Sequence, residues 1–343
     1  ILQNPDGHAT YARKGVRPPS KSYAVDYADV RGQILAKRAA EIAAAGGHNL
    51  LLVGSPGSGK TMIARRLPTI LPPLSEEEAL ESTRVHSVAG TLASGVSLLR
   101  ERPFRAPHHS VSQAGLLGGG SHPRPGEVSL AHHGVLFLDE LPEFRRGALE
   151  ALRQPVEEGN VRVVRAAASV RFPSRFLLVA AMNPCPCGYL GETRCSCDAS
   201  QVSRYAGRLS GPLLDRIDLQ VEVARVRKED LAGGTPGEAS ESIRERVATA
   251  RTLQVDRYGS ALLRNGSVEP GELIARGNFK SDAVAFLGNG MDRIGFSARA
   301  YNRILRVART IADLVAEDAV EERHIAEAIR YRLMDRPRYA GSV

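Results

Sequence analysis

The 343-residue sequence contains no tryptophan, few aromatic residues and no long apolar run. A membrane-crossing helix needs about 18 to 20 consecutive apolar residues, so no membrane-spanning segment is expected. Aromatic residues make up only 5% of the chain, which is too few for the base-stacking platform of an RNA-recognition module. Sequence-specific reading of bases is therefore not expected. The first residues also lack an apolar core like that of a signal peptide.

Cysteine is scarce as well, and its four copies lie within thirteen residues of one another, at Cys185, Cys187, Cys195 and Cys197. A disulfide framework would spread its cysteines along the chain, whereas a tight cluster favours a metal site in a reducing compartment. We therefore expect a cytoplasmic protein. The C-x-C…C-x-C pattern suits structural Zn²⁺ held by four thiolates, with free thiols or a redox pair as alternatives.

Basic residues are in excess, which gives a formal net charge of +8 and a pI near 9.5. This balance fits an anionic partner such as nucleic acid, or simply a soluble surface with a modest excess of arginine. Residues 1–24 mix Gly, Pro, Lys, Arg and Ser without periodicity and are expected to be a linker. Because the chain starts without Met, we also expect a missing upstream domain.

Short apolar runs alternate with helical patterns over residues 25–222. The runs are typical of buried parallel strands and cover residues 49–53, 134–138 and 176–181. The helical patterns cover residues 30–45, 60–67 and about 145–158. This alternation predicts an α/β core with a parallel sheet. Over residues 223–343 only helices are predicted, as a separate helical domain, at 239–258, 280–290, 297–316 and 321–334.

One motif lies between a predicted strand and a predicted helix and matches the phosphate-binding pattern GxxxxGK[ST]. Its residues are Gly54, Ser55, Pro56, Gly57, Ser58, Gly59, Lys60 and Thr61. The glycines let backbone N–H groups wrap the phosphates, and the N-terminus of the following helix adds positive potential. Lys60 is expected to reach the β- and γ-phosphates, and Thr61 to ligate Mg²⁺. The sequence therefore predicts a binding site for ATP and Mg²⁺.

Three polar residues follow the other predicted strands. Asp139 and Glu140 come directly after residues 134–138, and Asn183 follows residues 176–181. Carboxyl ends of parallel strands face the nucleotide crevice of such sheets. We expect Asp139 to hold Mg²⁺, Glu140 to orient and activate the attacking water, and Asn183 to hold that water near the γ-phosphate. The alternatives are solvated acids at a strand end and a turn asparagine.

Together these motifs resemble AAA+ P-loop ATPases of the magnesium-chelatase and MCM branch, with a C-terminal α-helical lid. Four further stretches are similar to the ComM/YifB family of magnesium-chelatase-like proteins: residues 102–109, 118–127, 181–188 and 297–303. The resemblance covers about residues 24–335. Members of that family resemble hexameric motors and are linked to DNA branch migration during natural transformation. Typical members carry an N-terminal Lon-protease-like domain.

The resemblance implies roles for two arginines and an assembly state. Arg216 matches the arginine finger, which reaches the γ-phosphate of a neighbouring subunit, and Arg299 matches the sensor-2 arginine of the lid. Whether Arg299 serves its own nucleotide or a neighbour's stays open at this point. A homo-hexamer is expected. The alternatives are a protein-remodelling ATPase of the magnesium-chelatase or MoxR type, and a binding module that uses ATP only as a switch.

The same resemblance points to DNA contacts. Alternation over residues 161–172 predicts a hairpin turning near 166–168, in the position of a pre-sensor-1 hairpin. Its arginines are expected to bind phosphates of single-stranded or branched DNA: Arg162, Arg165, Arg171 and, just beyond, Arg175. The alternative is an edge hairpin kept soluble by charge. Residues 85–130 occupy the position of a helix-2 insert, where His108 and His109 are expected to be hydrogen-bonding residues rather than metal ligands.

Overall fold

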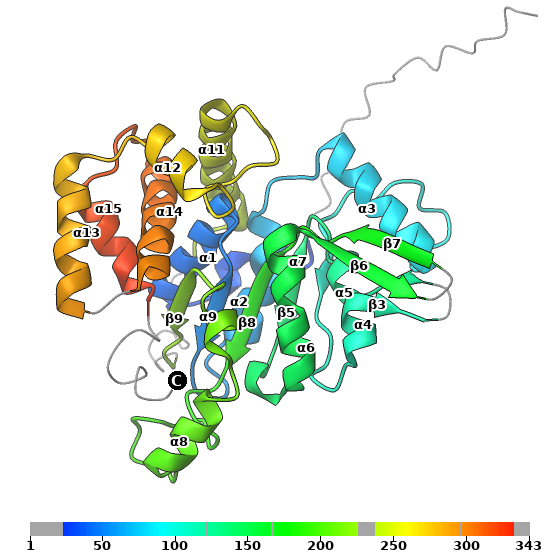
Figure 1. Cartoon of the computed structure of the whole chain (residues 1–343), viewed down its shortest axis with the longest axis horizontal. Coiled ribbons are helices and arrows are strands. Elements are labelled where there is room, and N and C mark those ends of the chain that lie inside the picture. The colour runs from blue at the N-terminus through cyan, green and yellow to red at the C-terminus, as the bar shows by residue number, and fades with distance from the viewer. Residues whose placement is uncertain (1–22, 121–122, 166–167, 226–236, 295–296, 333–343) are drawn as a thin grey trace, which may run out of the picture.

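The computed structural model describes residues 23–120, 123–165, 168–225, 237–294 and 297–332. Figure 1 shows a sheet flanked by helices on one side of the molecule and a group of lid helices on the other. Most of the predicted linker, the tip of the predicted hairpin and the end of the last predicted helix lie outside the described residues. Within them, no helix is both long and apolar enough to cross a membrane.

The core is built on a five-stranded parallel sheet with the order β2-β5-β8-β1-β9. The strands, in the same order, are Phe104–Arg105, Val135–Leu138, Leu177–Met182, Leu50–Val53 and Leu219–Glu222. The three central strands are buried along their whole length, as expected of strands that are covered on both faces. The α/β parallel sheet is confirmed. Strands β2 and β9 are additional to the three predicted ones.

Alternate residues of β1 point into two different apolar clusters. Leu50 and Leu52 pack with α1 (Ile34–Gly46), α2 (Lys60–Ile70) and the lid. Leu51 and Val53 pack with the helices of the opposite face. Those helices include α4 (Gln113–Leu117), α5 (Glu127–Leu130), α6 (Arg146–Ala151), α7 (Arg153–Glu158) and α9 (Gly211–Leu214). The sheet is therefore the middle layer of a three-layer sandwich.

Two predicted helices differ from the structure at their ends. The helix predicted from residue 30 begins only at Ile34, because Gln33 has a left-handed backbone with φ of 52°. The helix predicted over 145–158 is two short helices, α6 and α7, which meet at Leu152. A longer element was missed: α3 (Glu76–Ala89) opens on a capping box formed by Ser75 and Glu78.

The predicted insert and hairpin are both present. After α3, the insert contains only short elements, namely β2, α4, β3 (Gly118–Gly119), β4 (Arg124–Pro125) and α5. The hairpin consists of β6 (Asn160–Arg165) and β7 (Ala168–Pro173), which pair antiparallel. Figure 1 places it beside α3 and the insert, on the side of the sheet away from the lid. Helix α8 (Ala199–Ala206) follows the cysteine segment.

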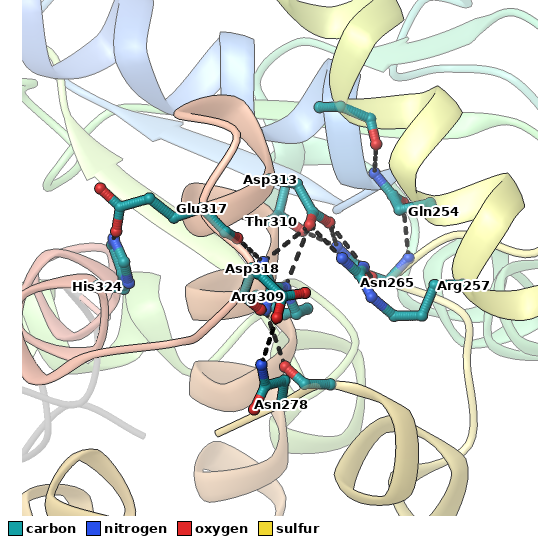
Figure 2. Close-up of polar contacts among 12 residues, drawn as sticks. Gln254, Arg257, Asn265, Asn278, Arg309, Thr310, Asp313, Glu317, Asp318 and His324 are labelled. Carbon is teal, nitrogen blue, oxygen red and sulfur yellow. Dashed lines mark hydrogen bonds and ion pairs between the residues drawn. The ribbon is translucent and has the colours of Figure 1, made fainter. Parts of the chain in front are cut away.

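The lid is helical, as predicted. Its helices are α11 (Ser240–Tyr258), α12 (Pro270–Arg276), α13 (Ser281–Ile294), α14 (Ala298–Leu314) and α15 (Glu322–Arg330). Figure 2 shows a polar network among residues of α11, α14, α15 and the turns between lid helices. At its centre the carboxylate of Asp313 accepts hydrogen bonds from Arg257, Arg309 and Asn265 at 2.5 to 3.2 Å. Because this buried charge is fully paired, it joins α11 and α14 without an uncompensated ion.

Polar contacts also fasten the lid to the core. The Nε2 atom of His48, just after α1, lies 2.7 Å from Oγ1 of Thr310 on α14. Arg303 donates to Oδ1 of Asp218 at 2.8 Å. Arg332 donates to the carbonyl oxygen of Ile217 at 3.0 Å. The lid is therefore bound by polar contacts to the segment that leads into β9.

Candidate active site

The predicted phosphate-binding loop connects β1 to α2 and folds around its own lysine. Gly57 and Gly59 have φ angles of 77° and 97°, which favour glycine. The Lys60 ammonium donates to the carbonyl oxygens of Gly54 at 2.6 Å and Ser55 at 3.0 Å. Burial lowers the pKa of Lys60, while the Asp139 and Glu140 carboxylates act in the opposite direction. The loop thus holds a cation at the place where phosphates bind.

The carboxyl ends of three neighbouring strands meet at this loop. Lys60 also donates to Oδ1 of Asn183, after β8, at 3.2 Å. The Thr61 hydroxyl donates to Oδ2 of Asp139, after β5, at 2.7 Å. The structure therefore brings together the four predicted residues Lys60, Thr61, Asp139 and Asn183.

This arrangement fits Mg²⁺ and a nucleotide. Thr61 and Asp139 present two oxygen atoms 2.7 Å apart, and oxygen is the ligand that Mg²⁺ prefers. The Oγ atom of Ser58 is buried in the loop without a hydrogen-bond partner among the described residues. This hydroxyl lies beside the backbone of Gly54, since a Cβ atom added to Gly54 would be 2.8 Å from it.

A cavity of about 160 Å³ adjoins the loop, a feature that the sequence did not indicate. It is lined by Val30, Gln33 and Met62, by Asp29 and Arg31, and by Ser58 and Gly59 of the loop itself. Gln33 donates from Nε2 to the Ser58 carbonyl oxygen at 3.0 Å, which ties the cavity wall to the loop. Its walls are partly apolar and partly polar, and it opens directly beside the loop.

Glu140 has an unusual environment for the predicted water-activating residue. Its backbone is left-handed, with φ of 53°, and its N–H group donates to Oδ1 of Asp139 at 3.0 Å. Its side chain is 56% exposed. The Oε2 atom lies 3.1 Å from Nδ1 of His109, a residue of the insert. This histidine is a second feature that the sequence did not connect with the site.

The predicted arginine finger lies at the amino-terminal ends of the strands, whereas the phosphate loop lies at their carboxyl ends. Strands β1 and β9 are parallel and in register, with Leu50 opposite Leu219. The loop follows β1, whereas Arg216 precedes β9. Asn49, which precedes β1, accordingly donates from Nδ2 to the Arg216 carbonyl oxygen at 2.9 Å. The backbone of Arg216 therefore lies at the opposite ends of these strands from the phosphate loop.

The predicted sensor-2 arginine lies close to Arg216, at the same ends of the strands. Arg299 opens α14, and its guanidinium is 2.8 Å from Oδ2 of Asp215, the residue before Arg216. The Arg299 side chain is 70% exposed. The Arg216 guanidinium bonds to the Pro212 carbonyl oxygen and to Oε1 of Glu157. The two arginines thus lie close together, each paired with a carboxylate, and only Arg299 is largely exposed.

The four cysteines form one cluster, as the spacing predicted. The Sγ atoms of Cys185, Cys187 and Cys195 are 3.4 to 3.9 Å apart, and all four sulfur atoms lie within 4.8 Å of one another. Tetrahedral zinc with Zn–S bonds of about 2.3 Å requires sulfurs about 3.8 Å apart. Backbone N–H groups of Ser196 and Tyr189 lower the pKa of Cys187 to about 6, whereas burial raises the pKa of Cys185 to about 12.

The segment that carries the cysteines, residues 183–198, is called the cysteine loop below, and it rests on the phosphate loop. Ser55 donates from its hydroxyl to Oε1 of Glu192 at 2.7 Å. A Cβ atom added to Gly188 would lie 2.5 Å from Cδ of Pro56, so the backbone of Gly188 packs directly on that proline. The cysteine loop and the phosphate loop are therefore in direct contact.

Comparison with known proteins agrees with this architecture. The family profile described as magnesium chelatase, subunit ChlI, matches residues 26–231, and the profile for the ChlI C-terminal part matches residues 237–332. The chain belongs to the magnesium chelatase ChlI family. The first match spans the parallel sheet and the second spans the lid, so both parts of this ChlI-family protein match the family.

Among individual relatives of this ChlI-family protein, YifB of Escherichia coli (strain K12) is 45% identical over 96% of this chain and 64% of its own length. The competence protein ComM of Haemophilus influenzae is 47% identical over 91% of this chain and 61% of its own length. The magnesium-chelatase 38 kDa subunit of Acidiphilium rubrum is 26% identical over 84% of each chain. The chain thus spans less than two thirds of the length of YifB and ComM.

The hairpin of this ChlI-family protein presents an apolar face and a basic face. Val161, Val163 and Phe172 are buried against the core. Arg162 and Arg171 are exposed and lie directly opposite each other across the β6–β7 ladder. Like charges in such pairs destabilise a sheet unless an anion lies between them. The side chain of Arg165 is outside the described part of the chain.

Arg175 lies at the root of the hairpin, beside a second group of candidate metal ligands, Glu81, His132 and His133. The Arg175 N–H donates to Nδ1 of His132 at 3.0 Å, so the proton of this ring is on Nε2. Nε2 faces Oε2 of Glu81 at 3.1 Å and donates to it. Burial and the neighbouring His133 lower the pKa of His132 to about 4, which keeps this ring neutral. The group is accordingly explained by hydrogen bonds without a metal.

Proposed function

We propose that this protein is an ATP-driven motor that moves along single-stranded or branched DNA and works as a ring of six copies. The observation that carries the DNA part is the exposed pair of Arg162 and Arg171, two like charges opposite each other on the outer face of the hairpin. Phosphate groups would neutralise this pair without reading base sequence. The net charge of +8 supports the same partner.

For the ATP part, we propose that the cavity beside Met62 takes the adenine base and that the loop takes the phosphates. Thr61 and Asp139 would hold Mg²⁺, which neutralises charge between the β- and γ-phosphates. Lys60 would turn from the loop carbonyls toward the phosphates. Glu140 would accept a proton from the attacking water, and Asn183 would orient that water.

We further propose that Arg216 and Arg299 act on the nucleotide of a neighbouring subunit. Both residues lie at the amino-terminal ends of the strands, away from their own phosphate loop at the carboxyl ends, and this position supports the assignment. A site completed by a neighbour hydrolyses ATP only within the assembly. In related chemistry such an arginine accelerates phosphoryl transfer by about 10³ to 10⁵.

The cysteine loop is proposed to hold structural Zn²⁺ through Cys185, Cys187, Cys195 and Cys197. The sulfur spacing supports tetrahedral coordination, and a site with four protein ligands leaves no open position for catalysis. The metal would fix the shape of the loop that rests on Pro56. We expect the protein to act in the cytoplasm, where thiols stay reduced.

A second candidate is a protein-remodelling ATPase of the magnesium-chelatase or MoxR type. Family membership favours it, since two relatives named as magnesium-chelatase subunits are 26% identical to this chain. Turnover of ATP by confirmed rings distinguishes the two, measured at fixed salt without DNA, with single-stranded DNA and with branched DNA. Stimulation of several-fold by DNA supports the motor, whereas equal turnover in all three samples supports the remodelling enzyme.

A further inference from the structure

We propose that a second cavity, lined by three arginines, is a binding site for phosphate groups. Its volume is about 490 Å³, and its walls include Arg146, Arg204 and Arg208. This space is called the arginine cavity below. Its lining contains no residue of the phosphate loop or of the β6–β7 hairpin, among the residues that the structure describes. The proposal therefore concerns a further site and does not depend on the proposed motor.

Two segments that are far apart in the sequence form the arginine cavity. One is the turn after β5, which runs into α6 and carries Arg146. The other is the end of α8, with Arg204 in its last turn and Arg208 just beyond it. Arg208 bridges the two segments, because its Nη1 group donates to the Pro142 carbonyl oxygen at 3.4 Å and to Oε1 of Glu143 at 2.8 Å. In Figure 1, α8 lies at the bottom of the view and the hairpin at the upper right, so the cavity is separate from the proposed DNA contacts.

The arginine cavity carries an excess of positive charge. Three of its lining residues are arginines and one, Glu143, is acidic, which leaves two positive charges in excess. The ion pair between Arg208 and Glu143 is weak, because its side chains are 52% and 43% exposed. One phosphate dianion or two phosphodiester groups would balance the excess.

The guanidinium groups have hydrogen-bond donors to spare. Arg146 is exposed and makes no hydrogen bond and no close ion pair within the described parts of the chain. Arg204 donates from Nη2 to the Ser200 hydroxyl at 3.1 Å. Each guanidinium has five N–H donors in a planar fork that matches phosphate oxygens. A tetrahedral phosphate accepts such bonds from several sides, which suits arginines that come from two segments.

The alternative is that these arginines only stabilise the ends of helices. Arg204 and Arg208 lie near the C-terminus of α8, where the helix dipole favours cations. This explanation does not cover Arg146, because it is the first residue of α6, where the dipole disfavours a cation. A shared anion accounts for all three positions.

Protection from an arginine-specific reagent tests the site directly. The full chain is treated with phenylglyoxal in the presence of ADP–Mg²⁺, and peptide mass spectrometry follows the modification of each arginine. Inorganic phosphate and oligothymidylate are added separately at matched ionic strength. We expect Arg146, Arg204 and Arg208 to react at least about fivefold more slowly with one or both probes, because a guanidinium bound to phosphate is covered. Arg276 and Arg323 on the exposed lid surface are the internal controls and should keep their rates.

The two probes distinguish the sources of phosphate. Protection by inorganic phosphate assigns the arginine cavity to phosphate-bearing solutes in general, whereas protection by oligothymidylate alone assigns it to the backbone of a nucleic-acid strand. Absence of protection with both probes, or an equal slowing of Arg276 and Arg323, overturns the proposal.

A double variant tests whether the three arginines share one anion. Arg146→Gln with Arg204→Gln should abolish the protection of Arg208, because too little charge remains to hold the phosphate. The thermal unfolding temperature should stay the same, since both altered side chains are exposed. Arg276→Gln with Arg323→Gln makes the same change in net charge on the lid and should leave Arg208 protected. Protection of Arg208 that survives in the cavity variant, or an equal loss in the lid variant, would contradict a shared site.

Discussion

Gly188 of the cysteine loop lies so close to Pro56 of the phosphate loop that a side chain would have no space between them. A Cβ atom at Gly188 would meet Cδ of the proline at 2.5 Å and Cγ at 2.8 Å. With the Ser55–Glu192 hydrogen bond, this contact makes the cysteine loop a support for the turn that wraps the phosphates. Changes in the cysteine loop should therefore be measurable as changes in nucleotide binding.

The first prediction concerns that contact. Gly188→Ala should weaken ATP binding about tenfold, or about 1.4 kcal/mol, because the methyl group pushes Pro56 outward and the residue is held at φ of 86°. Titration with a fluorescent ATP analogue measures the effect. Gly259→Ala is the control, since Gly259 has φ of 66° but no atom within 4 Å of the added carbon. Equal ATP affinity in the two variants would contradict the prediction.

The second prediction concerns the metal. Elemental analysis should find one zinc ion per chain, and Cys195→Ser or a strong chelator should remove it, because three thiolates hold zinc less tightly than four. ATP turnover should fall in parallel, since the loop that supports Ser55 and Pro56 loses its fixed shape. Full turnover in a sample shown to be free of zinc would refute the coupling.

The third prediction concerns which subunit each arginine serves. Lys60→Ala and Arg216→Ala proteins should each be inactive, but mixing them should restore activity at about one interface in four, where an intact finger meets an intact loop. A mixture of Arg216→Ala with Arg299→Ala should stay inactive. If both arginines act on the neighbour's nucleotide, every subunit in this mixture lacks one of the two that its neighbour needs. Recovery in that second mixture would mean that Arg299 serves its own subunit's nucleotide.

The fourth prediction concerns the hairpin. Reversing the charge of both Arg162 and Arg171 to Glu should weaken DNA binding at least about tenfold and reduce its salt dependence by about 0.7 per lost phosphate contact. Basal ATP turnover should change little, because neither residue touches the nucleotide site. The double variant Arg276→Glu and Arg323→Glu makes the same change in net charge on the exposed lid surface. If the lid variant weakens DNA binding equally, the contact is not specific to the hairpin.

The sequence predicted the local parts of this molecule well. The phosphate loop, the three central strands and the cysteine cluster are each encoded by a short stretch of chain, so spacing and apolar pattern suffice to find them. Strand β9 was missed because the polar Gln220, although buried, interrupts the apolar pattern of Leu219–Glu222. The left-handed turn at Gln33 was missed because non-glycine residues rarely adopt this conformation.

What could not be predicted are contacts between distant segments. His109 and Glu140 come from different elements, and no periodicity connects a loop of the insert with the end of a strand. The packing of Gly188 on Pro56 likewise depends on the folded path of the cysteine loop. Arg216 and Arg299 were identified by resemblance. Only the parallel register of β1 with β9 showed that Arg216 lies at the ends of the strands opposite the phosphate loop.

The central claim is that ATP hydrolysis at Lys60 and Glu140 moves DNA. The most direct measurement follows a labelled strand in a synthetic four-way junction mixed with confirmed rings and ATP–Mg²⁺, with Glu140→Gln as the blank. The account predicts ATP-dependent release of the strand by the wild type and none by Glu140→Gln, although the variant still binds ATP and the junction. An intact junction with wild-type rings that are hydrolysing ATP would contradict it.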